Sequence, residues 1–313
     1  MFEVRRYTPA DKPVWDAFVT KARNATFLFS RDYMDYHADR FTDHSLMVFK
    51  RGKLYALLPG NVRGAVFHSH QGLTYGGLLL GRDATADGVC DAFLAINEQL
   101  RRDGLSHVVY KPVPHIYHRI PAEEDLYALF VRCRAVLLSR NVSSTIVFDM
   151  RIPFTESRCS GLRKALHNGI VISESHDLQS FWRILVDNLR LRYAASPVHS
   201  LEEMRLLMSR FPDAIRLYVA ADAEGRMLGG TILYLTPNVV HTQYISATPY
   251  GKQHGALDLL FYHLINNIYA SYPYIDFGKS TVSDSADLNE QLIFQKEGFG
   301  ARAVCYDTYE YEL

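Results

Sequence analysis

The sequence predicts an α+β protein made of two similar units in tandem, and three observations support this. Strand-like and helix-like stretches follow one another twice in the same order, namely hairpin, further strands, helix, strand, helix and strand. The length of 313 residues exceeds the ~250–300 residues at which a single core usually stops growing. A composition of 48% hydrophobic and 22% charged residues leaves ample material for two cores. We expect domains at residues 1–150 and 151–313, each a mixed twisted sheet flanked by helices.

The first half begins with a strand and helices and continues with a clear hairpin. Residues 46–58 hold two strand-like runs on either side of Arg51-Gly52, a favourable two-residue turn. A helix is predicted at 87–102, because its apolar residues recur at helical spacing. The other predicted elements are strands at 62–68, 73–80 and 107–111, a helix at 123–131 and two strand-rich pieces within 135–150.

The second half repeats this order. Ser200 followed by Glu203 forms a capping box at the start of one helix. Alternating apolar and polar residues then predict a hairpin within 215–235. The remaining predicted elements are helices at 156–168, 177–193, 200–211, 256–270 and 287–297, and strands at 170–173, 239–246, 274–278 and 301–313.

Charge and cysteine content exclude some functions and leave others open. Lys+Arg and Asp+Glu are both 34, so no global field attracts nucleic acid or an anionic membrane, although a local basic groove for tRNA stays possible. The four cysteines lack metal-ligand spacing, so we expect buried reduced thiols and no metal. The N-terminus lacks the apolar segment of a signal peptide, and no apolar run approaches the ~18 residues of a membrane span. We therefore expect a cytoplasmic protein without a membrane span; the oligomeric state stays open.

A glycine-containing loop separates the strand at 239–246 from the helix at 256–270. The loop consists of Tyr250, Gly251, Lys252, Gln253, His254, Gly255 and Ala256. Such a loop can hold an anion, because its backbone N–H groups and the helix dipole point positive charge at the ligand. The alternative is that the two glycines only allow a tight turn between strand and helix.

The order of elements around this loop resembles the GNAT acyltransferase superfamily. The matching parts are the hairpin 215–235, the loop 251–256 and the tail 287–299, which ends in Gly-Phe. The resemblance implies that the strand before the loop diverges from its neighbour to hold the pantetheine arm of coenzyme A. It also implies that the loop amides bind the coenzyme A pyrophosphate.

Two such units in tandem are similar to the Fem-type branch, which includes aminoacyl-tRNA-dependent peptidoglycan transferases and related acyl-CoA proteins. Four short segments are similar to sequence motifs of that branch: Leu73–Gly77, Arg192–His199, Ile275–Gly278 and Gln295–Gly300. The chain departs from the family in two places. The loop lacks a complete glycine signature in either register, and Phe294 occupies the position of the tyrosine that often protonates the departing thiolate.

Acyl transfer by direct attack needs a base for the amine, stabilisation of the oxyanion and alignment of both substrates. The resemblance assigns Lys296 to charge stabilisation near the acyl ester; the alternative is a solvated lysine at a helix C-terminus. His241 and Tyr244 are catalytic candidates on opposite faces of the same strand, so at most one can face the cleft and the other packs. His241 is a candidate general base or a buried core histidine. Asp276 could act as a base, fix Lys279 or stabilise a turn.

Residues before the capping box are candidates for binding the acceptor. Arg192 could bind a phosphate or carboxylate with both arms of its guanidinium group, or form a surface ion pair. Tyr193, His199 and, in the first domain, Tyr75 complete this set. We expect the first domain to help bind the acceptor and to have no activity of its own.

The sequence thus predicts an N-acyltransferase that moves an acyl group from acyl-CoA to an amine on a small or cell-envelope-precursor acceptor, in a cleft between the domains. One alternative is an aminoacyl-tRNA-dependent peptidyltransferase acting on a cell-wall precursor. A second alternative is a non-catalytic binding protein with a degenerate GNAT fold.

Overall fold

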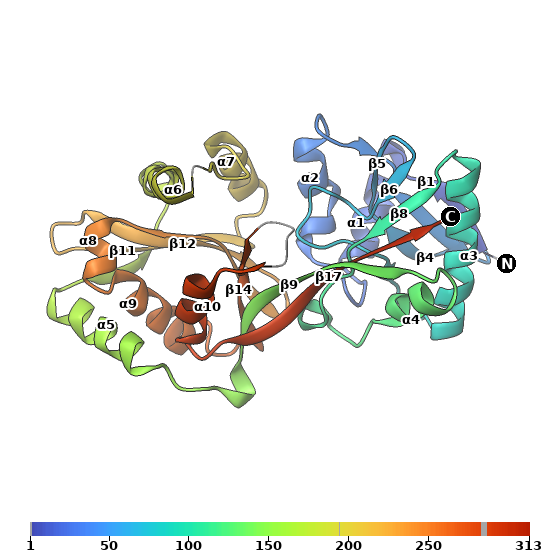
Figure 1. The fold of residues 1–313 in the computed structure, drawn as a ribbon. Helices are drawn as coiled ribbons and strands as arrows, with labels where there is room; N and C mark the ends of the chain where they lie inside the picture. The colour runs from blue at the N-terminus through green and yellow to red at the C-terminus, as the bar shows by residue number, and fades with distance from the viewer. Residues whose placement is uncertain (1, 194, 283–286) are drawn as a thin grey trace. The chain divides into compact units, whose positions relative to one another are not determined.

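The computed structural model describes residues 2–193, 195–282 and 287–313, and the side chains of 192, 193 and 282 are not described (Figure 1). The chain divides into two compact units. Unit 1 contains the chain up to Asn141 together with Cys305–Leu313, and unit 2 contains Val142–Val282 and Asp287–Val304. Two long strands, β9 (Val136–Val147) and β17 (Arg302–Glu312), carry residues of both units. The predicted α+β class with two mixed units is confirmed.

Unit 1 contains an antiparallel sheet in the order β1-β3-β4-β7. Its strands are β1 (Phe2–Arg6), β3 (Leu46–Lys50), β4 (Lys53–Leu58) and β7 (Leu79–Leu80). A second group of strands has the order β17-β8-β6-β5-β2, with β6 and β8 parallel. These strands are β2 (Thr42–Asp43), β5 (Asn61–Arg63), β6 (Val66–His68) and β8 (His107–Tyr110).

The helices of unit 1 are α1 (Lys12–Val19), α2 (Arg31–Met34), α3 (Ala86–Arg102) and α4 (Glu124–Val131). The residues that recur at helical spacing along one face of α3 are all buried: Val89, Phe93, Ile96, Asn97 and Leu100. Leu80 of β7 and Tyr110 of β8 belong to the same core. The 3.6-residue period therefore identified both the helix and its buried face.

Three predicted stretches of β-structure differ from those observed. Residues 62–68 form a hairpin, because Gly64 has φ +60 and turns the chain. Of the strand predicted at 73–80, only Leu79–Leu80 is extended and paired. Gly76 packs against the carbonyl of Ser69 and Gly77 has φ +85, so the preceding backbone forms a loop. The two pieces predicted within 135–150 are one strand, β9.

Unit 2 is a sheet in the order β10-β11-β12-β13-β14-β9, antiparallel except between β13 and β14. Its strands are β10 (Val171–Glu174), β11 (Ile215–Ala221), β12 (Met227–Leu235), β13 (Val239–Ala247) and β14 (Tyr274–Lys279). Helices α6 (Leu178–Tyr193) and α7 (Leu201–Arg210) cover one face, and α5 (Glu156–His167) and α9 (Ala256–His263) the other (Figure 1).

Short elements complete unit 2. They are α8 (Pro249–Gln253), a π-helical turn at Leu264–Ile268, the paired strands β15 (Thr281–Val282) and β16 (Asp287–Leu288), and α10 (Glu290–Glu297). The helix predicted at 256–270 thus changes from α to π geometry after His263. Phe261, Ile265 and Phe299 form part of the core beneath the sheet.

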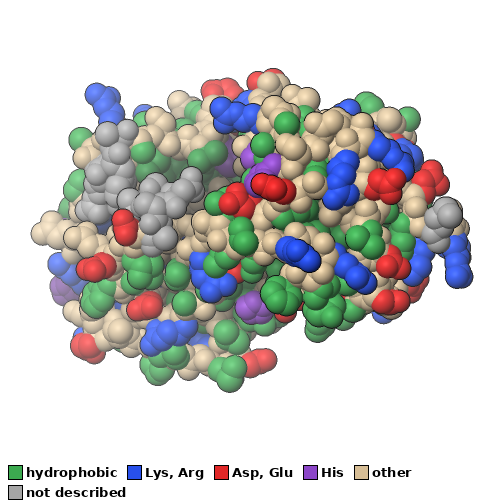
Figure 2. All heavy atoms as spheres, turned by 45° about the vertical axis from the view of Figure 1, so that its right-hand side comes forward, with side chains coloured by type: hydrophobic (Ala, Val, Ile, Leu, Met, Phe, Trp, Pro, Cys, Tyr) green, Lys and Arg blue, Asp and Glu red, His purple; other side chains and the backbone are tan. Residues whose placement is uncertain are grey.

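Basic and acidic side chains are interspersed on the face shown in Figure 2, in keeping with the net charge of zero. No helix in the described parts of the chain is long and apolar enough to cross a membrane. The described residues also contain no cluster of three or more His, Cys, Asp or Glu that could hold a metal. All four cysteines are free, but only Cys90 is buried, so the expectation of burial is wrong for exposed Cys305.

Candidate active site

The site in unit 2 lies where two parallel strands separate. β13 and β14 pair only from Val239 to His241 on β13 and from Tyr274 to Asp276 on β14. Beyond these residues β13 continues to Ala247, and within the described parts of the chain β12 is its only registered partner. This divergence is the feature that the family resemblance implied for the strand before the loop.

A cavity of about 190 Å³ lies beside the diverging half of β13. At ~30 Å³ for each molecule of liquid water, it has room for about six waters or a short acyl segment. Most of its walls are apolar and come from α6, β13, α9, β14, α10 and the turn after α10: Leu185, Leu189, Ile245, Leu257, Phe261, Phe277, Leu292 and Phe299. Lys252 and Lys296 are the charged residues among its lining.

Lys296 is held at the end of β14 by three hydrogen bonds. Its Nζ donates to the carbonyls of Gly278 (2.8 Å) and Lys279 (2.9 Å) and to Oγ of Ser280 (2.8 Å). Burial lowers the pKa of this amine to about 8, while the charge of Asp276 acts in the opposite direction. Lys296 is therefore buried rather than solvated, and its amine can change protonation state near neutral pH.

His241 and Asp276 form a buried pair next to this lysine. They are direct partners in the parallel register, and Nδ1 of His241 lies 2.8 Å from Oδ2 of Asp276. The other carboxylate oxygen accepts hydrogen bonds from the hydroxyls of Ser143 and Thr145 on β9. Gly278 contacts both groups, because Lys296 bonds its carbonyl and a Cβ there would lie 3.3 Å from Cε1 of His241.

A β-bulge changes the predicted faces of His241 and Tyr244. On β12, His241 pairs with Tyr234 and Tyr244 pairs with Ile232, so Gln243 is an extra residue in β13. Residues two apart on β12 share a face, and cross-strand partners share it with them. The prediction that His241 and Tyr244 lie on opposite faces is therefore wrong: the bulge brings both to the face that α6 covers.

Tyr244 contacts a second residue that the sequence singled out. Its hydroxyl lies 2.7 Å from Nδ1 of His199, and its ring packs edge-on against Trp182 of α6. Burial raises the pKa of the Tyr244 hydroxyl, so this phenol is neutral at ordinary pH. The structure thus brings together Tyr244 and His199, which the sequence placed in separate roles.

The loop at 250–256 is a helical turn rather than an open glycine cradle. Thr248 caps α8, and its hydroxyl accepts the amide of Gly251 at 3.0 Å. A Cβ at Gly251 would lie 2.3 Å from the carbonyl of Leu228, and Gly255 has φ +72 and packs on Gly161. Close packing and a left-handed turn therefore explain both glycines, and the Gly251 amide is already bonded.

Tyr250, Lys252, Gln253 and His254 lie at or near the protein surface, whereas Ala256 is buried. The rings of Tyr250 and His254 stack with centroids 3.8 Å apart, and Gln253 is exposed. Ala256 is buried at the start of α9. Lys252 differs, because its Nζ donates to Asn188, whose amide donates to Oγ of Ser246 at the cavity.

Arg192, Tyr193, Tyr75 and Phe294 are the remaining residues that the sequence singled out. The side chains of Arg192 and Tyr193 lie outside the described residues. Tyr75 belongs to unit 1, where it is buried with its hydroxyl 3.1 Å from that of Thr26. Phe294 is 66% exposed and is not part of the cavity lining.

Sequence reasoning missed Asn188, Ser143 and Thr145. Asn188 lies on α6 and links Lys252 to β13, while the two hydroxyls orient Asp276 from β9. A polar residue within the apolar pattern of α6 was the one available signal for Asn188. The strand pairing that brings β9 to β14 spans more than a hundred residues, so local sequence gave no signal for the hydroxyls.

Comparisons with known proteins bear on the fold and on one domain of the chain. Residues 160–285 match the family model described as an acetyltransferase (GNAT) domain. No curated protein sequence matches the chain.

Solved structures resemble the whole chain. FemX has a TM-score of 0.70 at 11% identity, covering 99% of this chain and 97% of FemX. The C-terminal domain of a putative lysylphosphatidylglycerol synthetase from Agrobacterium fabrum has a TM-score of 0.60 at 11% identity, covering 97% and 92%. A tandem GNAT protein from the clavulanic acid biosynthesis pathway has a TM-score of 0.52 at 11% identity, covering 100% and 98%. The chain therefore has the fold of the tandem GNAT proteins over its whole length, and its residues 160–285 match the model of a GNAT acetyltransferase domain.

Proposed function

We propose that the protein is an N-acyltransferase that binds an activated acyl group in unit 2 and transfers it to an amine. The observation that carries the proposal is the apolar cavity beside the diverging half of β13, with the buried amine of Lys296 in its wall. An acyl carbonyl in this cavity would lie beside a cation and beside strand amides that no β14 partner takes up, which suits a developing oxyanion.

In the proposed reaction the acceptor nitrogen attacks the carbonyl carbon, a C–N bond forms and the C–S or C–O bond to the donor breaks. His241 takes the proton of the attacking amine, and Asp276 orients the ring by bonding Nδ1. Tyr244 and His199 shape the wall of the site on the α6 side of the sheet.

Lys296 would protonate the departing group. Its pKa of about 8 is close to the ~8.5 of a thiol, so proton transfer from the ammonium to a thiolate is nearly balanced in free energy. The transfer releases one of the three hydrogen bonds that hold the amine. This role replaces the tyrosine of the family, whose position holds the exposed Phe294.

Acyl-CoA is the first candidate donor, since a cavity of this size and polarity suits a short acyl thioester. The ester of an aminoacyl-tRNA is the second candidate. The bonded amide of Gly251 favours it, because one donor of the pyrophosphate cradle is already used. The similarity to FemX supports an amine on a cell-wall precursor as the acceptor.

Binding of acetyl-CoA, measured by calorimetry and thermal shift, tests the proposal. Leu189→Trp fills the cavity from α6, and Leu191→Trp on the same helix is the matched control because Leu191 is 81% exposed. We expect wild type and Leu191→Trp to bind and Leu189→Trp to bind at least tenfold more weakly. Equal binding by both variants would refute the cavity as the acyl site.

No binding of acetyl-CoA by wild type at millimolar concentration would exclude acyl-CoA as donor. A charged-tRNA transfer assay with a peptide amine as acceptor would then separate the second donor from the non-catalytic alternative. Transfer that Leu189→Trp abolishes would support the ester donor, and no transfer from either donor would support a binding protein.

A further inference from the structure

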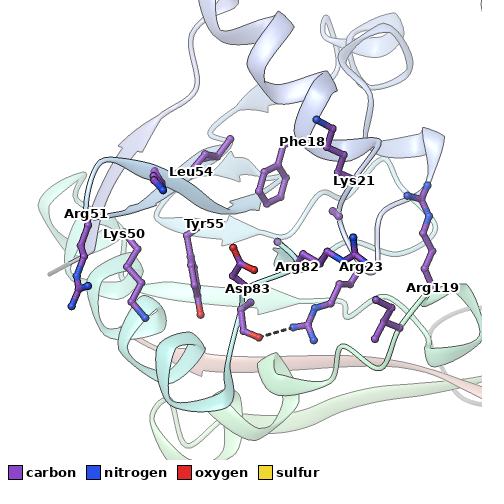
Figure 3. A pocket seen from close by; sticks show the side chains of 15 residues that line it. Phe18, Lys21, Arg23, Lys50, Arg51, Leu54, Tyr55, Arg82, Asp83 and Arg119 are labelled. Carbon is purple, nitrogen blue, oxygen red and sulfur yellow. Dashed lines mark hydrogen bonds between the residues drawn. The ribbon is translucent and has the colours of Figure 1, made fainter.

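A larger cavity in unit 1 is separate from the acyl site, and seven of its 15 lining residues are cations. It has a volume of about 840 Å³, within the ~300–1,000 Å³ of typical small-molecule sites. Its walls come from the end of α1, the β3–β4 hairpin, the residues before α3 and the residues before α4 (Figure 3). Seven basic side chains line it: Lys21, Arg23, Lys50, Arg51, Lys53, Arg82 and Arg119.

Most of this positive charge is not neutralised. Asp83 is the one carboxylate in the lining, and Glu124 pairs with Arg23 at 2.8 Å. Among the described residues, the other six cations have no carboxylate within ion-pair distance. Five of these six side chains are exposed and Lys50 is half-buried, so water solvates them. In a protein with 34 basic and 34 acidic residues, gathering them around one concave surface creates a local positive potential that attracts anions.

Several of these side chains are held in place without losing their charge. Arg23 donates to the carbonyls of Ala84 (3.3 Å) and Pro121 (3.0 Å), and Arg119 donates to that of Thr20. The amine of Lys50 lies 5.2 Å from the centroid of the Tyr55 ring. The N-terminus of α3 begins two residues beyond Ala84, and its dipole adds positive potential.

The cavity also has an apolar part. Figure 3 shows the ring of Phe18 between Lys50 and Arg51 on one side and Arg23 and Arg119 on the other. An aromatic surface flanked by cations suits a ligand with a planar or apolar group and a dense anionic group. A single carboxylate would leave most of the charge unbalanced, whereas a diphosphate offers several charges and matches the fork of an arginine.

We propose that this pocket binds a small molecule bearing a diphosphate, of about the size of a nucleoside diphosphate. The phosphates contact Lys50 and Arg82, and the organic part lies against Phe18. The concave shape favours a small molecule over a nucleic-acid strand, whose binding needs an extended stripe of charge. This inference does not depend on acyl transfer in unit 2.

Calorimetric titration of the full chain with ADP, inorganic pyrophosphate, adenosine and citrate tests the proposal. The variant K50A/R82A removes two pocket cations, and R63A/K164A removes two exposed cations outside the pocket, so the two variants have the same net charge. We expect ADP and pyrophosphate to bind wild type and R63A/K164A, and adenosine to bind much more weakly. We expect K50A/R82A to lose at least tenfold in affinity for both phosphates.

Unchanged ADP affinity in K50A/R82A, with an unaltered melting temperature, would overturn the proposal. Citrate binding as tight as pyrophosphate would do the same, because the pocket would then select charge alone. A single-stranded RNA that binds more tightly than ADP, with the same loss in K50A/R82A, would replace the small molecule by nucleic acid. ADP binding that survives Leu189→Trp would separate this site from the acyl cavity, so either proposal can fail without the other.

Discussion

The two units share one order of elements but differ where a strand separates from the next strand, between β13 and β14 in unit 2 and between β7 and β8 in unit 1. In unit 2, β13 leaves β14 after three registered pairs and a cavity opens beside it. In unit 1, the corresponding strand β7 does not neighbour β8 in a sheet, yet a side chain closes the gap. The hydroxyl of Tyr110 on β8 accepts the amide of Leu78 at 2.6 Å and donates to Asp125 at 2.6 Å. The topology thus provides a gap in both units, and side chains decide whether it is open.

The two units also differ in how their basic side chains are paired. In unit 2, Lys296 donates to three acceptors and Lys252 is bonded to Asn188. In unit 1, six basic side chains around one pocket have no carboxylate partner among the described residues. In unit 2, hydrogen bonds therefore fix the positions of the two cavity lysines. In unit 1, the pocket presents positive charge that an anionic ligand can neutralise.

The largest expected effect comes from removing the side chain that closes the gap in unit 1. Tyr110→Ala should lower the free energy of unfolding by about 4 kcal/mol, because a fully buried ring is lost and a cavity remains. Urea unfolding measures the change, with Tyr127→Ala on exposed α4 surface as control. A loss below about 1 kcal/mol would show that Tyr110 does not support the closed gap.

Lys296→Met should reduce acyl transfer by about a hundredfold, corresponding to ~2.7 kcal/mol of transition-state stabilisation. The wild-type rate should fall as pH rises through about 8, because the amine then loses the proton that the leaving group needs. This fall above about pH 8 should disappear in the variant, whereas any dependence that comes from the base His241 should remain. A purely structural lysine would change stability but leave the shape of the pH–rate profile intact; exposed Lys164→Met serves as control.

Asp125, which accepts the hydrogen bond of Tyr110 in unit 1, should also make the free energy of unfolding depend on pH. Burial raises the pKa of Asp125 to about 7, so the folded state keeps a proton that the unfolded state releases near pH 4. This contribution to stability is complete below pH 4 and is lost as pH rises through 7. Between pH 5 and 7, wild type should lose about 2 kcal/mol relative to Asp125→Asn. Asp91→Asn, an exposed residue of α3, should track wild type, and parallel curves for all three proteins would contradict the assignment.

Local signals predicted the elements, whereas long-range pairing determined the site. The period of α3, the hairpin at Arg51-Gly52 and the Ser200 capping box depend on neighbouring residues, and the structure confirms all three. The faces of His241 and Tyr244 depend on one bulged residue, Gln243, which no local pattern marked. The burial of Lys296 depends on carbonyls of β14 that precede it by 17 and 18 residues and approach it only in the folded chain.

The smallest expected effect concerns Phe294, which occupies the position where related proteins often have a catalytic tyrosine. Phe294→Tyr restores that residue, but the side chain is 66% exposed and outside the cavity lining, so the new hydroxyl would face water. We expect acyl-transfer rates within about twofold of wild type and an unchanged pH–rate profile, because Lys296 already supplies the proton. The same substitution in Lys296→Met tests the point more severely, since the proton of Lys296 could then no longer mask a contribution from residue 294. A rise of tenfold or more in that double variant would place residue 294 at the leaving group and would return Lys296 to the role of holding the end of β14.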